Sequence, residues 1–428
     1  MSSTLVADDF TPAPSVLRTV WDSPLYRGAT LSLFLSGLGG SAVAPQITLF
    51  LVDDLHVSLT TAGLYYLTNL TAPLAGYLVG ARSDRSGNRL GLFRLCTVAG
   101  FLGWIAMAAA DRAWMPFAIN ALMLAFSLAA GSQLFAAVHD DLRGSDSAAA
   151  DGVVSTVRMA LTAGWIIGPV LGSLLAAAAG PRALLVAAGL LTLAQMLPLG
   201  FTRSGALGAA AVAAVRESEH AHGEPEVSRR PGMRRMLPLF AFTGLFLLVY
   251  AGEPIKFGYL PIYMRDQLHV PTEVGGAVIG IQPLIELILM PIAVIVARRI
   301  GMLRLMTLGA ALTVGANLCF ALTGDTVGMF AGQILMGGVW GVFAALGIIV
   351  AQRLLPEAVA TASAVYITST AIANAFGGAT GSLGVATLGL PHVFLASALY
   401  AAIATVGMAA LSRSRHAHAA DGRGHPAE

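Results

Sequence analysis

Apolar runs of about 20 residues recur along the chain, and each is long enough to cross the hydrocarbon core of a bilayer as an α-helix. Six precede a polar segment, at 28–52, 60–80, 91–110, 114–138, 152–177 and 182–201. Six follow it, at 237–262, 273–297, 302–323, 326–350, 358–386 and 391–412. Only 11% of the residues are charged, against about 25% in an ordinary soluble domain. The sequence therefore predicts an all-α membrane protein with twelve transmembrane helices.

The polar segment between the two sets of runs divides the chain into two parts of similar length. It mixes acidic residues, histidines and a cluster of arginines, which is typical of a linker outside the membrane. We therefore expect a cytoplasmic tail, a six-helix bundle, a cytoplasmic linker, a second six-helix bundle and a second cytoplasmic tail. The expected bounds of these five parts are 1–27, 28–201, 202–236, 237–412 and 413–428.

Arginine distribution predicts which side of the membrane each loop faces. With the N-terminus inside, the cytoplasmic segments hold about twenty arginines, whereas the external loops hold only Arg112, Arg182 and Arg265. The first 27 residues lack the apolar core of a cleaved signal peptide. We expect a multi-pass protein of the cell's inner (plasma) membrane, with both termini in the cytoplasm.

The two halves carry the same short motif at the same place. The pattern D-x-L-H-V begins at Asp53 and again at Asp266, 213 residues later, and is followed by Gly63 and Gly276 respectively. A G-x-x-x-G pair in the fifth run recurs at the same offset in the eleventh. Chance similarity of short motifs is the alternative to duplication. A duplication in parallel orientation predicts two pseudo-symmetric bundles with a substrate site between them.

A glycine- and charge-containing loop follows the second run. Its form, G-x-x-x-D-R-x-G-x-R, is carried by Gly80, Asp84, Arg85, Gly87 and Arg89. Gly80 permits a close approach of helices, Gly87 permits a tight turn, and Asp84 is suited to an ion pair that latches one conformation. The motif resembles the cytoplasmic loop of the major facilitator superfamily; an ordinary basic loop is the alternative.

The fifth run contains spaced glycines and a proline, Gly164, Gly168 and Pro169. Such glycines form a flat face for close helix packing, and the proline removes one backbone donor. We interpret this segment as a gasket between rocking halves. It resembles the motif of antiporter members of the same superfamily, with ordinary small-residue packing as the alternative.

Four ionisable residues lie inside the predicted spans: Arg158, Glu253, Lys256 and Glu286. Charges are expensive to bury in a membrane, so each is a candidate functional residue. Glu253 and Lys256 are three residues apart and can pair on one helix face, in a structural or a functional role. The apolar neighbours of Glu286 favour its protonated form, which suits a carboxyl that gains and loses a proton. Proton coupling is assigned to Glu286, Glu253 and Arg158, with a merely structural carboxyl as the alternative for Glu286.

Neutral polar and aromatic side chains at membrane depth are suited to a hydroxylated ligand, because amides bond hydroxyls and rings stack on sugars. Simple bridging between helices is the alternative for each. The expected substrate-binding residues are Gln46, Asn69, Gln133, Lys256, Gln282, Trp340 and Asn374.

Several classes of function are excluded by what the sequence lacks. No ATP-binding G-x-x-x-x-G-K-[ST] motif and no catalytic motif of an enzyme occurs, and the arginines do not gather on a recognition helix for nucleic acid. The two cysteines, Cys96 and Cys319, lie in apolar stretches. No cofactor, metal or catalytic residue is expected.

Several segments together are similar to the sugar efflux transporter family of the major facilitator superfamily: Pro45 to His56, the loop from Gly80 to Arg89, Gln133, Arg158, Trp165 to Pro169, and Glu286. The resemblance implies proton-coupled export of sugars or glycosides by a carrier, expected to be a monomer in the lipid bilayer. It also implies that Arg158 and Glu286 match charged intramembrane positions of that family. A multidrug/proton antiporter of the same fold is the first alternative, and a non-transporting membrane receptor or scaffold is the second.

Overall fold

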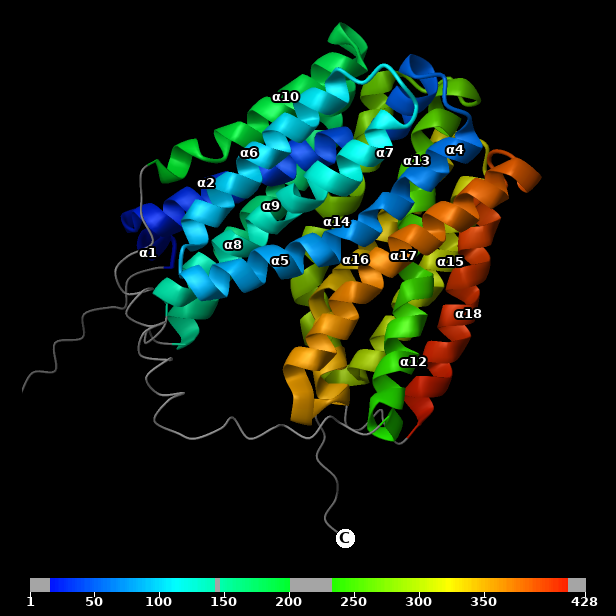
Figure 1. Cartoon of the computed structure of the whole chain (residues 1–428). Coiled ribbons are helices and arrows are strands. Elements are labelled where there is room, and N and C mark those ends of the chain that lie inside the picture. Colours follow the sequence, from blue (N-terminus) through cyan, green and yellow to red (C-terminus); the bar gives the residue numbers. More distant parts are fainter. Residues whose placement is uncertain (1–15, 143–146, 201–232, 415–428) are drawn as a thin grey trace, which may run out of the picture.

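The computed structural model describes residues 16–142, 147–200 and 233–414 (Figure 1). Most of the predicted tails and of the predicted linker lies outside these residues. The described residues form helices and connecting turns, with no β-strand among them. The prediction of an all-α protein is confirmed.

The first bundle is built from long helices interrupted by short irregular turns of helix. Its elements are α1 (Val16–Asp22), α2 (Pro24–Val43), α3 (Ile47–Leu49), η1 (Phe50–Asp54), α4 (Leu59–Gly63), η2 (Leu64–Thr71), α5 (Ala72–Ser86), α6 (Arg89–Ala108), α7 (Met115–Ile119), η3 (Asn120–Leu124), α8 (Ala125–Asp141), α9 (Ser147–Ala179), α10 (Pro181–Ala194) and η4 (Leu197–Leu199).

The second bundle has fewer interruptions. Its elements are α12 (Met233–Tyr250), α13 (Gly252–Asp266), α14 (Thr272–Ile300), α15 (Met302–Leu322), α16 (Thr326–Leu354), η5 (Pro356–Ala358), α17 (Val359–Leu388) and α18 (Phe394–Arg413). In Figure 1 the helices of this bundle lie beside those of the first, which are drawn in blue to green.

Nine helices of the described part of the chain are long and apolar enough to cross a membrane. The count becomes ten when α2 and the segment Ile47–Asp54, which meet at a bend of 42°, are taken as one span. The helical segments around α5 and α17 are not among these spans. A multi-pass membrane protein is therefore confirmed, whereas the count of twelve remains a prediction.

Prolines explain two of the breaks inside predicted spans. Pro45 follows the end of α2, and Pro254 lies in the first turn of α13, directly after the break at Ala251. Proline has no backbone N–H, so Pro254 cannot donate to the carbonyl of Tyr250 one turn earlier. The predicted span 237–262 therefore remains one span with a one-residue interruption at Ala251, and Glu253 lies in the first turn after it.

The spaced glycines of α9 pack against α2 of the same bundle. A Cβ placed on Gly164 would lie 2.5 Å from the backbone nitrogen of Leu38, and one on Gly168 would lie 1.9 Å from the Ser41 hydroxyl. The two glycines of the expected gasket thus join two helices within one half, while Pro169 of the same motif lies against Gly276 of the other half. In the second bundle Gly377 meets the Ala251 carbonyl in the same manner.

Two of the contacts between the bundles are related by the sequence repeat. Gly276 of α14 lies against the Pro169 carbonyl of α9, and Gly63 of α4 lies against Ser382 of α17. The hydroxyl of Ser382 also donates to the Thr60 carbonyl across the same seam, at 2.6 Å. Gly276 and Ser382 are each 213 residues beyond Gly63 and Pro169, so the two contacts are related by the repeat found in the sequence.

The repeated D-x-L-H-V motif forms the same turn in both halves. His56 and His269 have φ angles of 51° and 52°, in the left-handed region. The following valine, Val57 or Val270, donates a backbone hydrogen bond of 2.9 Å to the sixth residue before it. The duplication predicted from the sequence is therefore visible as local geometry. Both turns lie at the end of the molecule that the arginine distribution assigns to the outside, here called the outer end.

Candidate functional site

A cavity lies between the two bundles, among α9, α13, α14 and α16. Its volume is about 300 Å³, at the lower end of the roughly 300–1,000 Å³ of typical small-molecule sites. It is lined by Arg158, Leu161, Thr162, Trp165, Pro169, Tyr250, Glu253, Phe257, Ile279, Gln282, Pro283, Glu286, Met290, Trp340 and Ala344. Both halves contribute residues, as the predicted interface site requires.

Glu253 and Lys256 form a buried ion pair at the start of α13. The Lys256 ammonium donates to both carboxylate oxygens of Glu253, at 2.8 Å each. The side chains are 1% exposed for Lys256 and 9% for Glu253. The predicted pairing on one helix face is confirmed. A buried ion pair is stable only with good geometry and further hydrogen bonds, because each charge has lost its hydration.

Two side chains from other helices supply those further hydrogen bonds. The Trp340 indole N–H of α16 donates to Oε1 of Glu253 at 2.8 Å. Lys256 also donates to the side-chain oxygen of Gln282 on α14. The four residues thus form one network that joins α13, α14 and α16, and all four are less than a tenth exposed.

Aromatic rings form the walls beside this network. Trp165 of α9 meets Phe257 edge to face across the two bundles, with ring centroids 6.5 Å apart. Tyr250 packs against Trp340 at 5.1 Å. The Lys256 ammonium lies 4.5 Å from the centre of the Phe257 ring, within reach of a cation–π interaction. The site therefore combines a charged, hydrogen-bonding floor with flat apolar faces.

Glu286 and Arg158 line the same cavity from opposite bundles. In the described part of the chain Glu286 has no hydrogen bond or ion pair, in contrast to Glu253. Glu286 is half-buried, and Arg158 is exposed toward the cavity it lines. The structure thus places all three residues predicted for proton coupling at one cavity. The carboxyl of Glu253 is hydrogen-bonded there, whereas that of Glu286 is not, within the described residues.

Sequence reasoning did not assign the aromatic residues Tyr250 and Phe257 to the site. Phe257 lies four residues after Glu253 on α13, and this spacing of one helix face is already present in the sequence. Tyr250 lies three residues before Glu253 but at the end of α12, so the interruption at Ala251 lies between them. Trp165 follows Gly164 in the glycine motif, and its direction toward α13 depends on how the bundles meet.

Five of the predicted substrate-binding residues do not line this cavity. One of them, Lys256, lies directly behind it and bonds to Glu253 and Gln282, which do line it. Gln46 donates to the Ser173 hydroxyl at 3.2 Å and lies nearer the outer end. Asn69 accepts a hydrogen bond from Asn120 at 3.1 Å, within the first bundle. The remaining two are Gln133, which is 3% exposed, and Asn374, whose amide donates to its own helix α17.

The loop motif folds into a compact ion-pair cluster within the first bundle. Arg89 donates to Asp84 at 2.6 Å, to Asp140 of α8 at 3.0 Å and to the Ser83 hydroxyl at 2.9 Å. Gly87, with φ of 63°, ends α5 in the left-handed conformation that its predicted turn requires. A Cβ on Gly80 would meet no atom within 4 Å, so the helix contact expected there is not made in this conformation.

Metal-binding chemistry finds no support in the described residues, since they contain no group of three or more His, Cys, Asp and Glu suited to an ion. Cys96 is buried and Cys319 is partly buried, and both are free.

Comparison with known proteins agrees with this architecture. Sugar efflux transporter A of Dickeya chrysanthemi is 26% identical over 79% of this chain and 83% of its own length. Sugar efflux transporter B of Salmonella typhimurium is 24% identical over 78% of this chain and 82% of its own length. The resemblance to sugar efflux transporters drawn from the sequence is therefore confirmed.

Solved structures share the fold at low sequence identity. Nucleoside transporter NupG has a TM-score of 0.73 at 15% identity, over 91% of this chain and 100% of that chain. A D-xylose-proton symporter has a TM-score of 0.70 at 14% identity, over 90% and 96% of the two chains. At this identity the two likenesses show that the chain shares the fold of these proteins. The Major Facilitator Superfamily profile matches residues 29–328 and 242–426, and the chain belongs to that superfamily.

Proposed function

We propose that this chain is a secondary active transporter that exports sugars or glycosides in exchange for protons. Relatives named as sugar efflux transporters align with most of the chain. The central cavity, at about 300 Å³, suits a small hydroxylated ligand. Its carboxylates, amide and rings match the two needs of a sugar, which are hydrogen bonds to hydroxyls and a flat apolar surface.

The observation that carries proton coupling is the contrast between the two cavity carboxyls. Glu253 is held by hydrogen bonds from Lys256 and Trp340. Glu286 faces the same cavity without such a partner in the described residues. Glu286 is therefore our candidate for the group that gains and loses a proton, while Glu253 and Arg158 tune that step or bind substrate hydroxyls.

Transport in this proposal follows alternating access. The two bundles rock about the central cavity, substrate enters from the cytoplasm, and protonation of Glu286 from outside resets the carrier. We further propose that the protein works as a monomer in the inner membrane. The arginine distribution supports the proposal that both termini are in the cytoplasm.

The test is Glu286→Gln in inverted membrane vesicles, with radiolabelled lactose and glucose and an imposed acidic interior. We expect the unaltered protein to accumulate sugar only with the proton gradient. Glu286→Gln keeps a neutral side chain of the same shape, so it should still exchange labelled for unlabelled sugar but lose the response to the gradient. Glu273→Gln, on the exposed first turn of the same helix, is the matched control. A gradient response equal to that of the control would exclude Glu286 as the coupling group.

A second candidate function is favoured by the aromatic walls. Trp165, Phe257 and Tyr250 surround a cavity that also contains carboxylates, and this combination binds lipophilic cations by cation–π attraction. A multidrug/proton antiporter would give cells resistance to structurally unrelated cations. Absence of sugar flux in vesicles that hold folded protein, together with such resistance, would favour this candidate over sugar export.

A further inference from the structure

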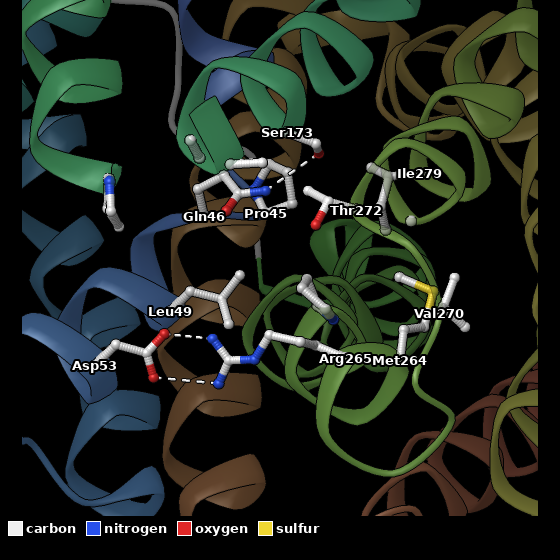
Figure 2. Close-up of a pocket in the computed structure, with 15 residues that line it drawn as sticks. Pro45, Gln46, Leu49, Asp53, Ser173, Met264, Arg265, Val270, Thr272 and Ile279 are labelled. Atoms are coloured by element: carbon white, nitrogen blue, oxygen red, sulfur yellow. Dashed lines mark hydrogen bonds and ion pairs between the residues drawn. The ribbon is translucent and has the colours of Figure 1, made fainter. Parts of the chain in front are cut away.

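A second pocket lies between the bundles, closer to the outer end than the central cavity (Figure 2). It is formed by the break after α2, by the end of α9 and by the turn between α13 and α14. Pro169 belongs to the central cavity, and Ser173, one helical turn further along α9, belongs to this outer pocket. Gly276 lies against both residues, and Ile279 lines both spaces.

The polar groups of the outer pocket come from both bundles. Gln46 and Asp53 belong to the first bundle, and Arg265 and Thr272 belong to the second. Figure 2 shows their side chains around one space. Gln46 is 8% exposed, and its amide N–H is bonded to Ser173, which leaves the amide oxygen as an acceptor. Thr272 offers a hydroxyl that can donate and accept.

Charge in this pocket favours a neutral ligand. Its charged lining residues are Asp53 and Arg265, which form a two-pronged ion pair across the bundles, at 3.1 Å for one of its bonds. Arg265 also binds Asp266, which lies outside the pocket. The guanidinium is thus already matched by two carboxylates, and an added anion would meet no unbalanced positive charge.

Size and wall chemistry narrow the ligand further. The volume is about 230 Å³, below the roughly 300–1,000 Å³ of sites for drug-sized ligands. Pro45, Leu49, Pro261, Met264 and Ile279 give the pocket apolar walls. A small ring with hydroxyls around its edge and apolar faces satisfies both the walls and the polar groups.

We propose that the outer pocket is a second binding site, separate from the central cavity, for a neutral monosaccharide on the outer side. Its hydroxyls bond to Gln46 of the first bundle and to Thr272 of the second, beside the Asp53–Arg265 pair. A ligand that bridges both bundles binds only while they are together at this end, so it stabilises that conformation. Sugar that has already left the cell would thereby slow further opening of the outer end. This site goes beyond the proposed function and can exist without it.

The test measures protection of an introduced cysteine in the purified full-length protein, with glucose as the probe. Gly275 lines the pocket, and a Cβ there would meet only Met264, at 3.9 Å, so Gly275→Cys fits. The background carries Cys96→Ala and Cys319→Ala. With glucose at about ten times its dissociation constant, mass action should slow alkylation of this cysteine by a maleimide about tenfold. Asp111→Cys, at an exposed loop position that does not line the pocket, should react at an unchanged rate.

Two further variants separate the outer site from the central one. Gln46→Leu should abolish protection, and Ser173 keeps its own hydrogen bond to the Pro169 carbonyl in that variant. Thr272→Val should weaken protection without changing the shape of the side chain. Gln282→Leu, in the central cavity, should leave protection intact.

Unchanged alkylation in the presence of glucose overturns the proposal. Protection that survives Gln46→Leu but disappears with Gln282→Leu also overturns it, because the effect would then arise in the central cavity. Protection without any sugar flux would support the outer site while contradicting the proposed function. Sugar flux without protection would support the proposed function and contradict the outer site.

Discussion

Lys256 donates hydrogen bonds to both oxygens of the Glu253 carboxylate from one turn along α13, and its ammonium lies 4.5 Å from the centre of the Phe257 ring. Lys256 is the chain's only lysine. A compact ammonium reaches two carboxylate oxygens and an amide at once, whereas the wide guanidinium of arginine would need more space. The pair fixes the broken seventh span to α14 and α16 through Gln282 and Trp340.

Removing one partner of this pair should destabilise the protein strongly. Lys256→Met leaves Glu253 as an uncompensated buried charge, and such losses amount to about 3–5 kcal/mol. We expect a large drop in the thermal midpoint of the purified protein. The double variant Lys256→Met with Glu253→Gln removes both charges and should recover a large part of the loss. Equal stability of the single and double variants would show that the charge of Glu253 is not the cause.

Regular helices could be predicted from the sequence because a membrane span must satisfy its backbone internally over about 20 residues. The runs at 302–323 and 326–350 correspond to α15 and α16 within a few residues. The break in the seventh span was not predicted, although Pro254 is the signal for it. Spans were predicted from apolar composition, which is continuous across the break. The loss of one backbone hydrogen bond at Pro254 does not change that composition.

The residues of the site were only partly predictable. The depth of a residue in the membrane does not show which face of its helix turns toward the other bundle. Glu286, Gln282 and Trp340 were expected at the interface and line the cavity. Asn69 was expected there on the same grounds, yet it turns toward Asn120 within its own bundle. An amide in a span satisfies its hydrogen bonds wherever a partner lies, and that partner is set by helix packing rather than by the local sequence.

Close packing of α9 on α2 should make its glycines intolerant of even one methyl group. Gly164→Ala would place a carbon 2.5 Å from backbone atoms of Phe34 and Leu38, which cannot move aside as a flexible side chain does. We expect a loss of about 1–3 kcal/mol in unfolding free energy, typical of overpacking. Gly40→Ala in α2 is the control, since a Cβ there meets nothing within 4 Å. Its stability should stay level or rise, and similar losses for both variants would contradict the packing argument.

The left-handed backbone at the two repeated turns should make both halves sensitive to the same substitution. His56 and His269 are exposed and have φ near +50°, a region that costs side-chain-bearing residues about 1–2 kcal/mol. Replacement by β-branched valine should lower stability at either position, whereas glycine should be tolerated. His392→Val is the control, because that exposed histidine is not among the residues with positive φ. A valine effect at only one of the two turns would argue against their equivalence in the intact protein.

The ion-pair cluster of the loop motif should depend on the shape of Arg89 as well as on its charge. Arg89 uses Nε for Asp140 and Nη1 for Asp84 and Ser83. Arg89→Lys keeps the charge, but one ammonium cannot reproduce this fork of donors between α5 and α8. Asp84 is 68% exposed, so solvent screens its share of the cluster and the total loss should be about 1 kcal/mol. Thermal midpoints measured at low and high salt should differ more for the unaltered protein than for Arg89→Lys. The exposed Arg85→Lys serves as the control, and an equal salt response in all three proteins would show that the cluster contributes no measurable stability.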